Sequence, residues 1–381
     1  MKIKRVKGDI IIPIVVAAIA LFGVVAVYSA SRYVGEEDYG NGFYFALKQL
    51  VGFFGGLIAM FLTMHFDYKK YFKAAKWLYL CGLLLLALVF VPGLGVKVYG
   101  ASRWINLRLF TIQPSEFARL FLVMFLAAYF AKKPESARSF KGVSVPLLAG
   151  GACAVLIMLE PNMSVTVCVA ATLLVVLFAA GVKIKTFLII LVPALALVPV
   201  LIIMEPYRLK RLVAFLDPWA TPKGEGYQLI QSLYGLGNGG FFGSGLFNSR
   251  QKYRFLPFSE SDFILSVIGE ELGFIGVIAL LFASFVLAWR GIKAAKNASD
   301  LFGYLLAVGI SSSFFLQVVV NALVVSGSVP PTGIPFPLVS SGNTSLVVNM
   351  AAFGVLYNIS ARGKAEVMIK RGNTLPPRIS A

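Results

Sequence analysis

Long apolar runs recur along the whole chain, and short polar segments separate them. Each run has about 17 or more residues, which is about the length that an α-helix needs to cross a bilayer. The runs predict ten membrane-spanning helices, at residues 9–30, 44–66, 76–92, 114–131, 144–159, 163–181, 186–204, 262–290, 302–325 and 345–360. The alternation of apolar and polar residues that is typical of a membrane β-barrel is absent. We therefore predict an all-α polytopic membrane protein with a single membrane domain over residues 1–381.

The composition agrees with this class, and the charges indicate an orientation. Of the 381 residues, 58% are hydrophobic and only 14% are charged, and the mean hydropathy is +0.82. Basic residues gather at the N-terminus, at 67–76, 131–141, 182–185 and 290–296, and in the tail from Arg362. With ten spans these segments share one face, which the positive-inside rule makes cytoplasmic. We expect both termini in the cytoplasm, including a tail over about 361–381.

Much of the net charge of +18 therefore sets the topology, and it does not indicate nucleic-acid binding. The basic tail also favours anionic lipid headgroups.

Cys81, Cys153 and Cys168 all lie in predicted spans and form neither a metal pattern nor an obvious disulfide, so we interpret them as packing residues. His65 is the only histidine, which excludes histidine-based catalysis on the outer face.

The longest segment outside the predicted spans, about 205–261, lies on the outer face between the seventh and eighth spans. It is either a solvated loop or a site for an anion near the membrane surface, because arginine forks match phosphate geometry. Apolar residues at helical spacing, with Arg208 and Arg211 on the other side, predict an amphipathic interfacial helix over 208–216. The glycines of 235–240 lack the strand that a nucleotide fingerprint requires, so they predict tight turns or close backbone approach.

Other polar groups collect at the outer ends of the spans. Arg103 and Trp104 precede the fourth span, and Glu116 and Arg119 are three residues apart on it, so they can pair. The segment 329–345 is rich in proline, glycine and serine. Such an irregular backbone is tolerated only where it faces water or is buried against protein.

The eighth predicted span begins with three acids, Asp262, Glu270 and Glu271. On a continuous helix Asp262, Ser266 and Glu270 would share one side, with Glu271 nearly opposite Asp262. The uninterrupted apolar stretch begins only at Leu272, so we expect the acids to face a hydrated outer cavity. Asp262 is a candidate general base or, alternatively, a partner of the helix dipole. We expect Glu270 and Glu271 to be structural partners of loop arginines.

These motifs together resemble the SEDS family (shape, elongation, division and sporulation), which includes RodA, FtsW and SpoVE. The resemblance covers essentially the whole chain and is carried by "ASRWI…QPSEFARL", "YQLIQSLYGLGNGGFFGSGL", "SDFILSVIGEELG" and "PPTGIPFPLVSSGNTSL". It implies a peptidoglycan glycosyltransferase that polymerises lipid II at the outer surface of the bacterial cytoplasmic membrane. It also implies a class B penicillin-binding protein as partner, together with other division or elongation complex proteins.

The resemblance maps the essential aspartate of the family onto Asp262. The candidate substrate-binding residues are Arg103, Trp104, Glu116, Arg119, Arg208, Arg211, Glu270 and Ser340. A carboxylate at Asp262 can accept the proton of a sugar 4-hydroxyl as it attacks an anomeric carbon. The leaving lipid pyrophosphate needs positive charge, from the arginines or from a divalent cation, Mg²⁺ or Mn²⁺. No ligand cluster for a metal is present, and direct displacement inverts the anomeric carbon without a second nucleophile.

The chain departs from the family pattern at three places. The EPD motif that is usual in the family is replaced by Glu160-Pro161-Asn162, and the usual SYGGSS is replaced by SSGNTS at residues 340–345. The usual His-Thr before the aspartate is replaced by Glu260-Ser261. Loss of the aspartate at 162 could weaken a contact or a cation site, and Glu260 could restore a carboxylate near Asp262. Division, elongation and sporulation roles are not distinguished.

Two other functions stay open: a lipid II flippase and a non-catalytic scaffold for a penicillin-binding protein. A flippase predicts ionisable residues through the full membrane depth, whereas the polar groups here gather at the outer end. A scaffold predicts that Asp262→Ala leaves function intact.

Overall fold

The computed structural model describes residues 8–98, 101–107 and 110–373. Every predicted span corresponds to an α-helix. These helices are α1 (Ile11–Tyr39), α2 (Tyr44–His65), α3 (Tyr68–Leu88), α4 (Pro114–Lys132), α5 (Phe140–Leu159), α6 (Met163–Ala179), α7 (Ile184–Ile203), α10 (Ile264–Lys296), α11 (Leu301–Val325) and α12 (Asn343–Asn373). In the described part of the chain nine of them are long and apolar enough to cross a membrane, and α6 is apolar but shorter. The chain is therefore a multi-pass helical membrane protein.

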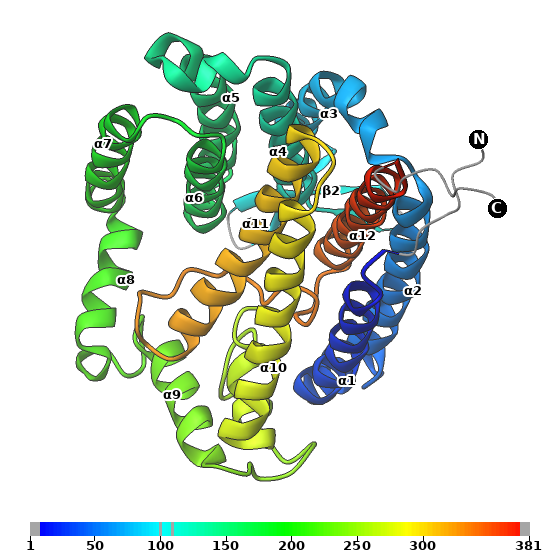
Figure 1. Cartoon of the computed structure of the whole chain (residues 1–381). Helices are drawn as coiled ribbons and strands as arrows, with labels where there is room; N and C mark the ends of the chain where they lie inside the picture. The colour runs from blue at the N-terminus through cyan, green and yellow to red at the C-terminus, as the bar shows by residue number, and fades with distance from the viewer. Residues whose placement is uncertain (1–7, 99–100, 108–109, 374–381) are drawn as a thin grey trace, which may run out of the picture.

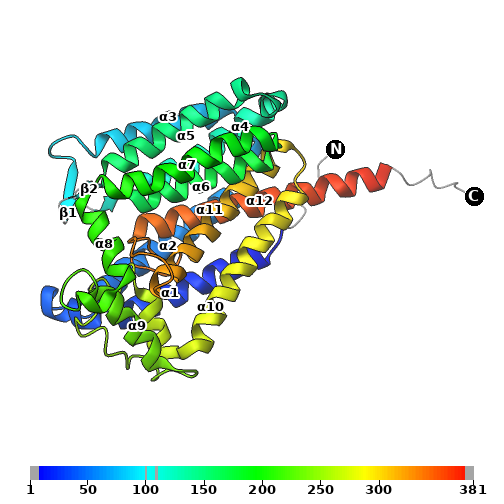
Figure 2. The ribbon, with the colours of Figure 1, turned by 90° about the vertical axis from the view of Figure 1, so that its left-hand side faces the viewer.

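The remaining elements lie in the connections. α8 (Pro206–Leu216), the 3₁₀ turn η2 (Pro218–Ala220) and α9 (Tyr227–Gly239) belong to the long loop, and η1 (Pro134–Arg138) joins α4 to α5. The connection between α3 and α4 forms a small antiparallel sheet in the order β1–β2–β3, from Gly95–Val98, Ala101–Asn106 and Thr111–Ile112. Figure 2 shows the sheet and α8 at one end of the bundle.

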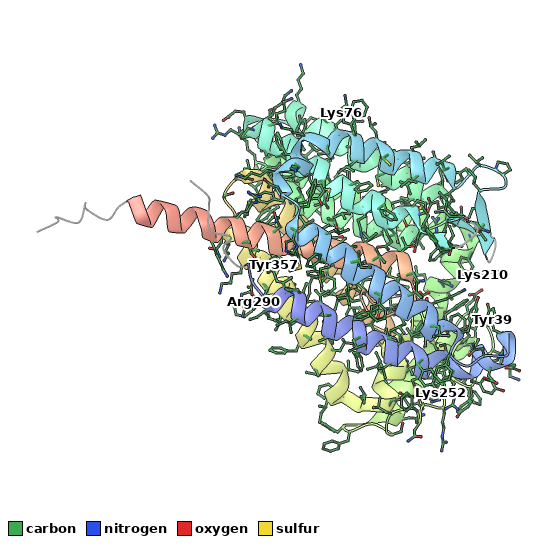
Figure 3. The ribbon with its side chains drawn as sticks, turned by 90° about the vertical axis from the view of Figure 1, so that its right-hand side faces the viewer. Tyr39, Lys76, Lys210, Lys252, Arg290 and Tyr357 are labelled. Carbon is green, nitrogen blue, oxygen red and sulfur yellow. The ribbon has the colours of Figure 1, made fainter. Side chains whose placement is uncertain are left out.

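The start of α1 and the end of α12 lie at the opposite end of the bundle (Figure 2). In Figure 3, Arg290 and Tyr357 lie toward this end, whereas Lys210 and Lys252 lie toward the sheet end. The basic segment 290–296 thus shares an end with both described chain ends, as an even number of spans requires. That this end is cytoplasmic stays a prediction.

Two helix ends differ from the expectation. α1 continues to Tyr39 and stops at Gly40, whose φ of 62° gives the left-handed cap that glycine adopts readily. α12 continues to Asn373 and projects from the bundle (Figure 2), so residues 361–373 are helical and not an irregular tail. Charge keeps this segment out of hydrocarbon, but Ala, Glu, Lys and Met favour helix all the same. Residues 374–381 lie outside the described part.

The bundle has a buried centre and an exposed flank. α11 runs through the middle of the bundle (Figure 1) and packs against α4, α6, α10 and α12, with Leu305 and Leu306 fully buried. By contrast, α7 buries none of its residues and packs mainly against α6 and α8. Its uniformly apolar sequence suits contact with lipid.

α10 is not one continuous helix. Gly273 has φ 66° and ψ −168°, so residues 264–272 form a separate short helix before the membrane-spanning part. A side chain at Gly273 would collide with the backbone of Gly243, because a Cβ there would lie 2.4 Å from its nitrogen. The kink falls next to Leu272, where the uninterrupted apolar stretch was predicted to begin.

The long loop confirms two predictions. Residues 206–216 form the helix α8, and the apolar side chains of Leu209, Val213 and Leu216 are exposed along it. At Gly239 a Cβ would lie 1.9 Å from the carbonyl oxygen of Gly269. At Gly235 a Cβ would lie 2.6 Å from Ser266 Oγ, so Gly235 and Gly239 serve close approach of α9 to the first part of α10, while Gly240 has a positive φ of 54° after the helix.

Candidate functional site

Asp262 lies in a turn before α10, whose first helical residue is Ile264. The expectation that Asp262, Ser266 and Glu270 share one side of a helix is therefore wrong for Asp262. The turn places the carboxyl beside the α11–α12 loop: Oδ1 accepts a hydrogen bond from Ser261 Oγ at 2.8 Å, and a Cβ added to Gly333 would lie 3.2 Å from Oδ2. Asp262 is half-buried.

The backbone of this turn is held at three successive positions. The carbonyl oxygens of residues 260, 261 and 262 accept hydrogen bonds from Ser341 N (2.9 Å), Ser340 Oγ (2.6 Å) and Asn321 Nδ2 (2.8 Å). Ser340 Oγ also accepts a bond from the backbone N–H of Phe336 at 2.8 Å. The predicted site residue Ser340 is thus buried, and its hydroxyl is used inside the protein.

Two arginines from different elements influence Asp262. Arg103, on β2, donates to the carbonyl oxygens of Glu160 (3.1 Å) and Pro161 (2.5 Å). Arg211, on α8, donates to the carbonyl oxygen of Pro331 (3.3 Å). These bonds anchor both guanidinium groups to irregular backbone at the sheet end of the bundle.

Burial raises the pKa of Asp262 above its ordinary value, while the Ser261 hydroxyl, Arg103 and Arg211 act in the opposite direction. Burial dominates because removing a carboxylate from water disfavours its charged form. Burial, and more weakly the nearby charge of Asp262, also raise the pKa of Glu260, so a second carboxyl lies near the first.

The two loop arginines have separate surroundings. Arg208 donates to the carbonyl oxygen of Leu201 (2.9 Å) and to Met158 Sδ (3.4 Å), which directs it toward α5 and α7. Arg211 instead faces the α11–α12 loop and acts on Asp262. The sequence left open which arginine belongs with the aspartate, and the structure brings Arg211 to it.

Glu116 and Arg119 form the predicted pair. Arg119 Nη2 lies 2.7 Å from Glu116 Oε2, and the two side chains are only 6% and 2% exposed. Arg119 Nη1 and Ser115 Oγ have no hydrogen-bond partner among the described residues. Trp104 lies on β2 opposite Val96 and is half-buried.

Glu270 and Glu271 are not exposed to a hydrated cavity. The Glu270 carboxylate accepts hydrogen bonds from Ser249 Oγ (2.5 Å) and from the backbone N–H groups of Arg250 (3.1 Å) and Gln251 (3.2 Å). The prediction that arginine side chains would pair with these acids is wrong. The loop over 244–252 folds onto the acids, and its own backbone and serine donors need buried acceptors.

Glu271 is held in the same manner from two directions. Its Oε1 accepts hydrogen bonds from Ser29 Oγ (2.6 Å) on α1 and from Ser249 N (3.2 Å), and Lys252 Nζ lies 3.4 Å away. The two acids therefore join the long loop to α10 and α1.

The sequence did not predict that the carboxyl of Glu160 is buried. It is fully buried, both carboxyl oxygens lack a partner in the described part of the chain, and burial raises its pKa to about 8. Its sequence position between two spans gave no sign that the carboxyl points inward. Asn162 caps α6, since Oδ1 accepts a bond from Val165 N at 3.4 Å, and asparagine serves this role as well as aspartate.

The described residues hold no group of three or more His, Cys, Asp or Glu side chains that could ligate a metal ion. A divalent cation held only by protein ligands does not fit this arrangement of the described residues.

Comparisons with known proteins match the chain over nearly its full length. The family model FtsW/RodA/SpoVE, described as "Cell cycle protein", matches residues 9–365. Stage V sporulation protein E of Bacillus subtilis is 40% identical over 361 residues, which cover 94% of this chain and 99% of the relative. A probable peptidoglycan glycosyltransferase FtsW of Trichlorobacter lovleyi is 41% identical over 359 residues, 93% of each chain.

Solved structures have the same fold. One chain of a peptidoglycan synthase complex, solved in work on the coordination of polymerization and crosslinking, is 30% identical with a TM-score of 0.77, over 93% of this chain and 98% of that one. The rod shape determining protein RodA of Thermus thermophilus is 27% identical with a TM-score of 0.69, over 93% and 97%.

Proposed function

The chain belongs to the family of cell cycle proteins that includes FtsW, RodA and SpoVE, and we propose that it is a peptidoglycan glycosyltransferase. Its substrate is lipid II, a disaccharide-pentapeptide on undecaprenyl pyrophosphate, which it polymerises into glycan strands. The relatives named as peptidoglycan glycosyltransferases support this activity, since they match the chain along almost its whole length.

The observation that carries the proposal is the surroundings of Asp262. Its carboxyl is half-buried, has a raised pKa and lies under the influence of Arg103 and Arg211. A general base works best when its pKa lies near the working pH, and burial moves the pKa of Asp262 upward from its ordinary value. Cationic groups beside it suit the negative charge of a pyrophosphate.

The proposed reaction is one displacement. The sugar 4-hydroxyl oxygen of one substrate bonds to the anomeric carbon of another, and its proton passes to the Asp262 carboxylate. The bond between that carbon and the pyrophosphate oxygen breaks, and the leaving group takes the electron pair. The anomeric carbon is inverted, so no second nucleophile is required.

The leaving pyrophosphate needs positive charge. Arg103 and Arg211 supply it, and Arg208, Trp104 and the buried Glu116–Arg119 pair belong to the proposed donor side. Mg²⁺ is commonly bound through one or two carboxylates together with substrate phosphates. Mg²⁺ or Mn²⁺ is therefore the alternative source of charge, and it would arrive with the substrate.

The proposed location is the bacterial cytoplasmic membrane, with the sheet end of the bundle facing outside. The gathering of basic segments at the opposite end supports this orientation. A class B penicillin-binding protein is the proposed partner. The similarity to a chain from a peptidoglycan synthase complex supports it.

The test is polymerisation of purified lipid II by the purified protein with its partner. We expect polymer from the unmodified protein and a rate roughly 10²- to 10⁴-fold lower for Asp262→Asn and Asp262→Ala, the range for loss of a general base. Elution in detergent and partner binding should not change. Normal polymerisation by both variants would contradict the proposal and favour a scaffold role.

A further inference from the structure

We propose that Asn321 is a positioning residue that holds Asp262 in its reactive place; this inference rests on the proposed function. Asn321 lies one turn before the end of α11 and is fully buried. Its Nδ2 donates one hydrogen bond to the carbonyl oxygen of Asp262 (2.8 Å) and another to that of Ile334 (2.7 Å). One amide thus joins the turn before α10 to the α11–α12 loop.

The orientation of this amide follows from its partners. Both neighbouring groups are carbonyl oxygens, which only accept hydrogen bonds, so the NH₂ end of Asn321 must face them. Both of its N–H donors are then used. A shorter or apolar side chain would leave two buried carbonyl oxygens without this donor.

The bond from Asn321 to the carbonyl oxygen of Ile334 is as important as the bond to that of Asp262. Ile334 follows Gly333, whose φ is 74° and whose added Cβ would lie 3.2 Å from Asp262 Oδ2. The bond to Ile334 therefore holds the backbone that faces Asp262 Oδ2. Asn321 positions both the main chain that carries Asp262 and the wall opposite its side chain.

The same loop controls the charge next to the aspartate. Arg211 Nη1 donates to the carbonyl oxygen of Pro331, three residues before Ile334, and Ser164 Oγ donates to that of Thr332. Among the described residues the cations that act on Asp262 are Arg103 and Arg211, and the charge of Asp262 in turn acts on Glu260. Release of the loop at Ile334 would alter the placement of Arg211 relative to Asp262.

Misplacement of a reacting group by about 1 Å can lower a rate roughly 10²-fold while substrate binding is retained. Loss of the Asn321 bonds should therefore reduce kcat and leave KM nearly unchanged. A residue that only stabilised the bundle would instead lower the amount of folded protein, with the rate per folded molecule unchanged.

The experiment compares Asn321→Leu, which keeps the approximate size of the side chain, with Asn349→Leu. Asn349 is a buried amide on α12 whose donor bonds, among the residues that the structure describes, go only to O and Oγ of Ser345 on its own helix. The readouts are kcat and KM for lipid II polymerisation with the partner, normalised to folded protein from gel filtration.

We expect Asn321→Leu to lower kcat by roughly 10- to 100-fold with KM within about twofold, and Asn349→Leu to retain the unmodified values. Unchanged kcat in Asn321→Leu, or an equal loss in Asn349→Leu, would overturn the inference.

Ser340→Ala is the second variant if Asn321→Leu does not fold. It removes the adjacent bond to the carbonyl oxygen of Ser261 and should also lower kcat and not KM. Normal kcat in this variant would then overturn the inference. Absence of polymer from the unmodified protein would instead refute the proposed function.

Discussion

Asp262 and the pair Glu270–Glu271 lie within ten residues of each other, yet their surroundings differ. Glu270 receives three hydrogen bonds from the loop over 249–251, and Glu271 receives bonds from Ser29 and Ser249. Asp262 receives one, from Ser261, and among the described residues no donor reaches its Oδ2. The donors meet Glu270 at Oε2 and Glu271 at Oε1, and both residues are almost fully buried, whereas Asp262 is half-buried and receives a single side-chain donor.

This difference indicates which acids stabilise the fold and which acid is available for a reaction. A buried carboxylate whose oxygen is engaged by several protein donors is out of reach of a substrate hydroxyl and serves as an internal acceptor. A half-buried carboxyl that is held through its backbone, with cations nearby and a single side-chain donor, can take a substrate proton. The bonds of Ser340, Ser341 and Asn321 go to the carbonyl oxygens of 260–262, so the turn is rigid and the side chain remains available.

The largest expected effect on stability comes from Glu270→Ala. It leaves two buried donors and the partly buried Arg250 N–H without their acceptor, at roughly 1–3 kcal/mol for each buried donor, so the free energy of unfolding should fall by at least about 2 kcal/mol. Thermal unfolding in detergent measures it. Glu270→Gln retains one acceptor oxygen, so its free energy of unfolding should lie between those of the unmodified protein and Glu270→Ala. An unfolding temperature equal to that of the unmodified protein would remove the distinction between the two acid sites.

Arg103→Gln tests the electrostatics of the open site. Asp262 acts as a base only when deprotonated, so kcat falls as the pH drops through its pKa, which burial has already raised. The positive charge of Arg103 opposes this rise. Without that charge the pKa of Asp262 increases further, so the acidic limb of the profile of kcat against pH moves to higher pH. Arg103→Lys keeps the charge and should leave the limb in place. A limb that moves to lower pH in Arg103→Gln would be inconsistent with this arrangement.

The smallest effect is expected for Ser29→Ala. It removes one of the bonds to Glu271, while Ser249 N and Lys252 remain. A hydrogen bond to a charged group contributes about 1.5–3 kcal/mol, and the remaining donors should keep the loss near the lower end. Ser31→Ala is the matched control, since within the described part of the chain Ser31 Oγ bonds only to the carbonyl oxygen of Val27 on its own helix. Equal unfolding temperatures for the two variants would show that Glu271 does not depend on α1.

Local pattern predicted much of the molecule. The ten apolar runs became helices, the spacing of Glu116 and Arg119 became a buried ion pair, and two glycines of 235–240 allow α9 to approach α10. These features depend on near neighbours in the chain or on the length of a run. The amphipathic pattern of 208–216 likewise needed only the period of a helix.

Other features depended on partners far along the chain. Nothing near Glu270 indicates that donors about 20 residues earlier would fold back onto it, and nothing near Glu160 shows that its carboxyl is buried. The expected alignment of Asp262 with Ser266 and Glu270 was wrong because α10 begins only at Ile264.

By itself the sequence determined the class of protein, the order of its ten apolar helices and the short stretches in which polar chemistry gathers, because hydrophobic length and helical period are local properties. Only the tertiary structure decided which acid is free to react and which arginine faces it. That choice depends on hydrogen bonds between segments such as Asn321 and Asp262, which are 59 residues apart in the chain and meet only when the bundle closes.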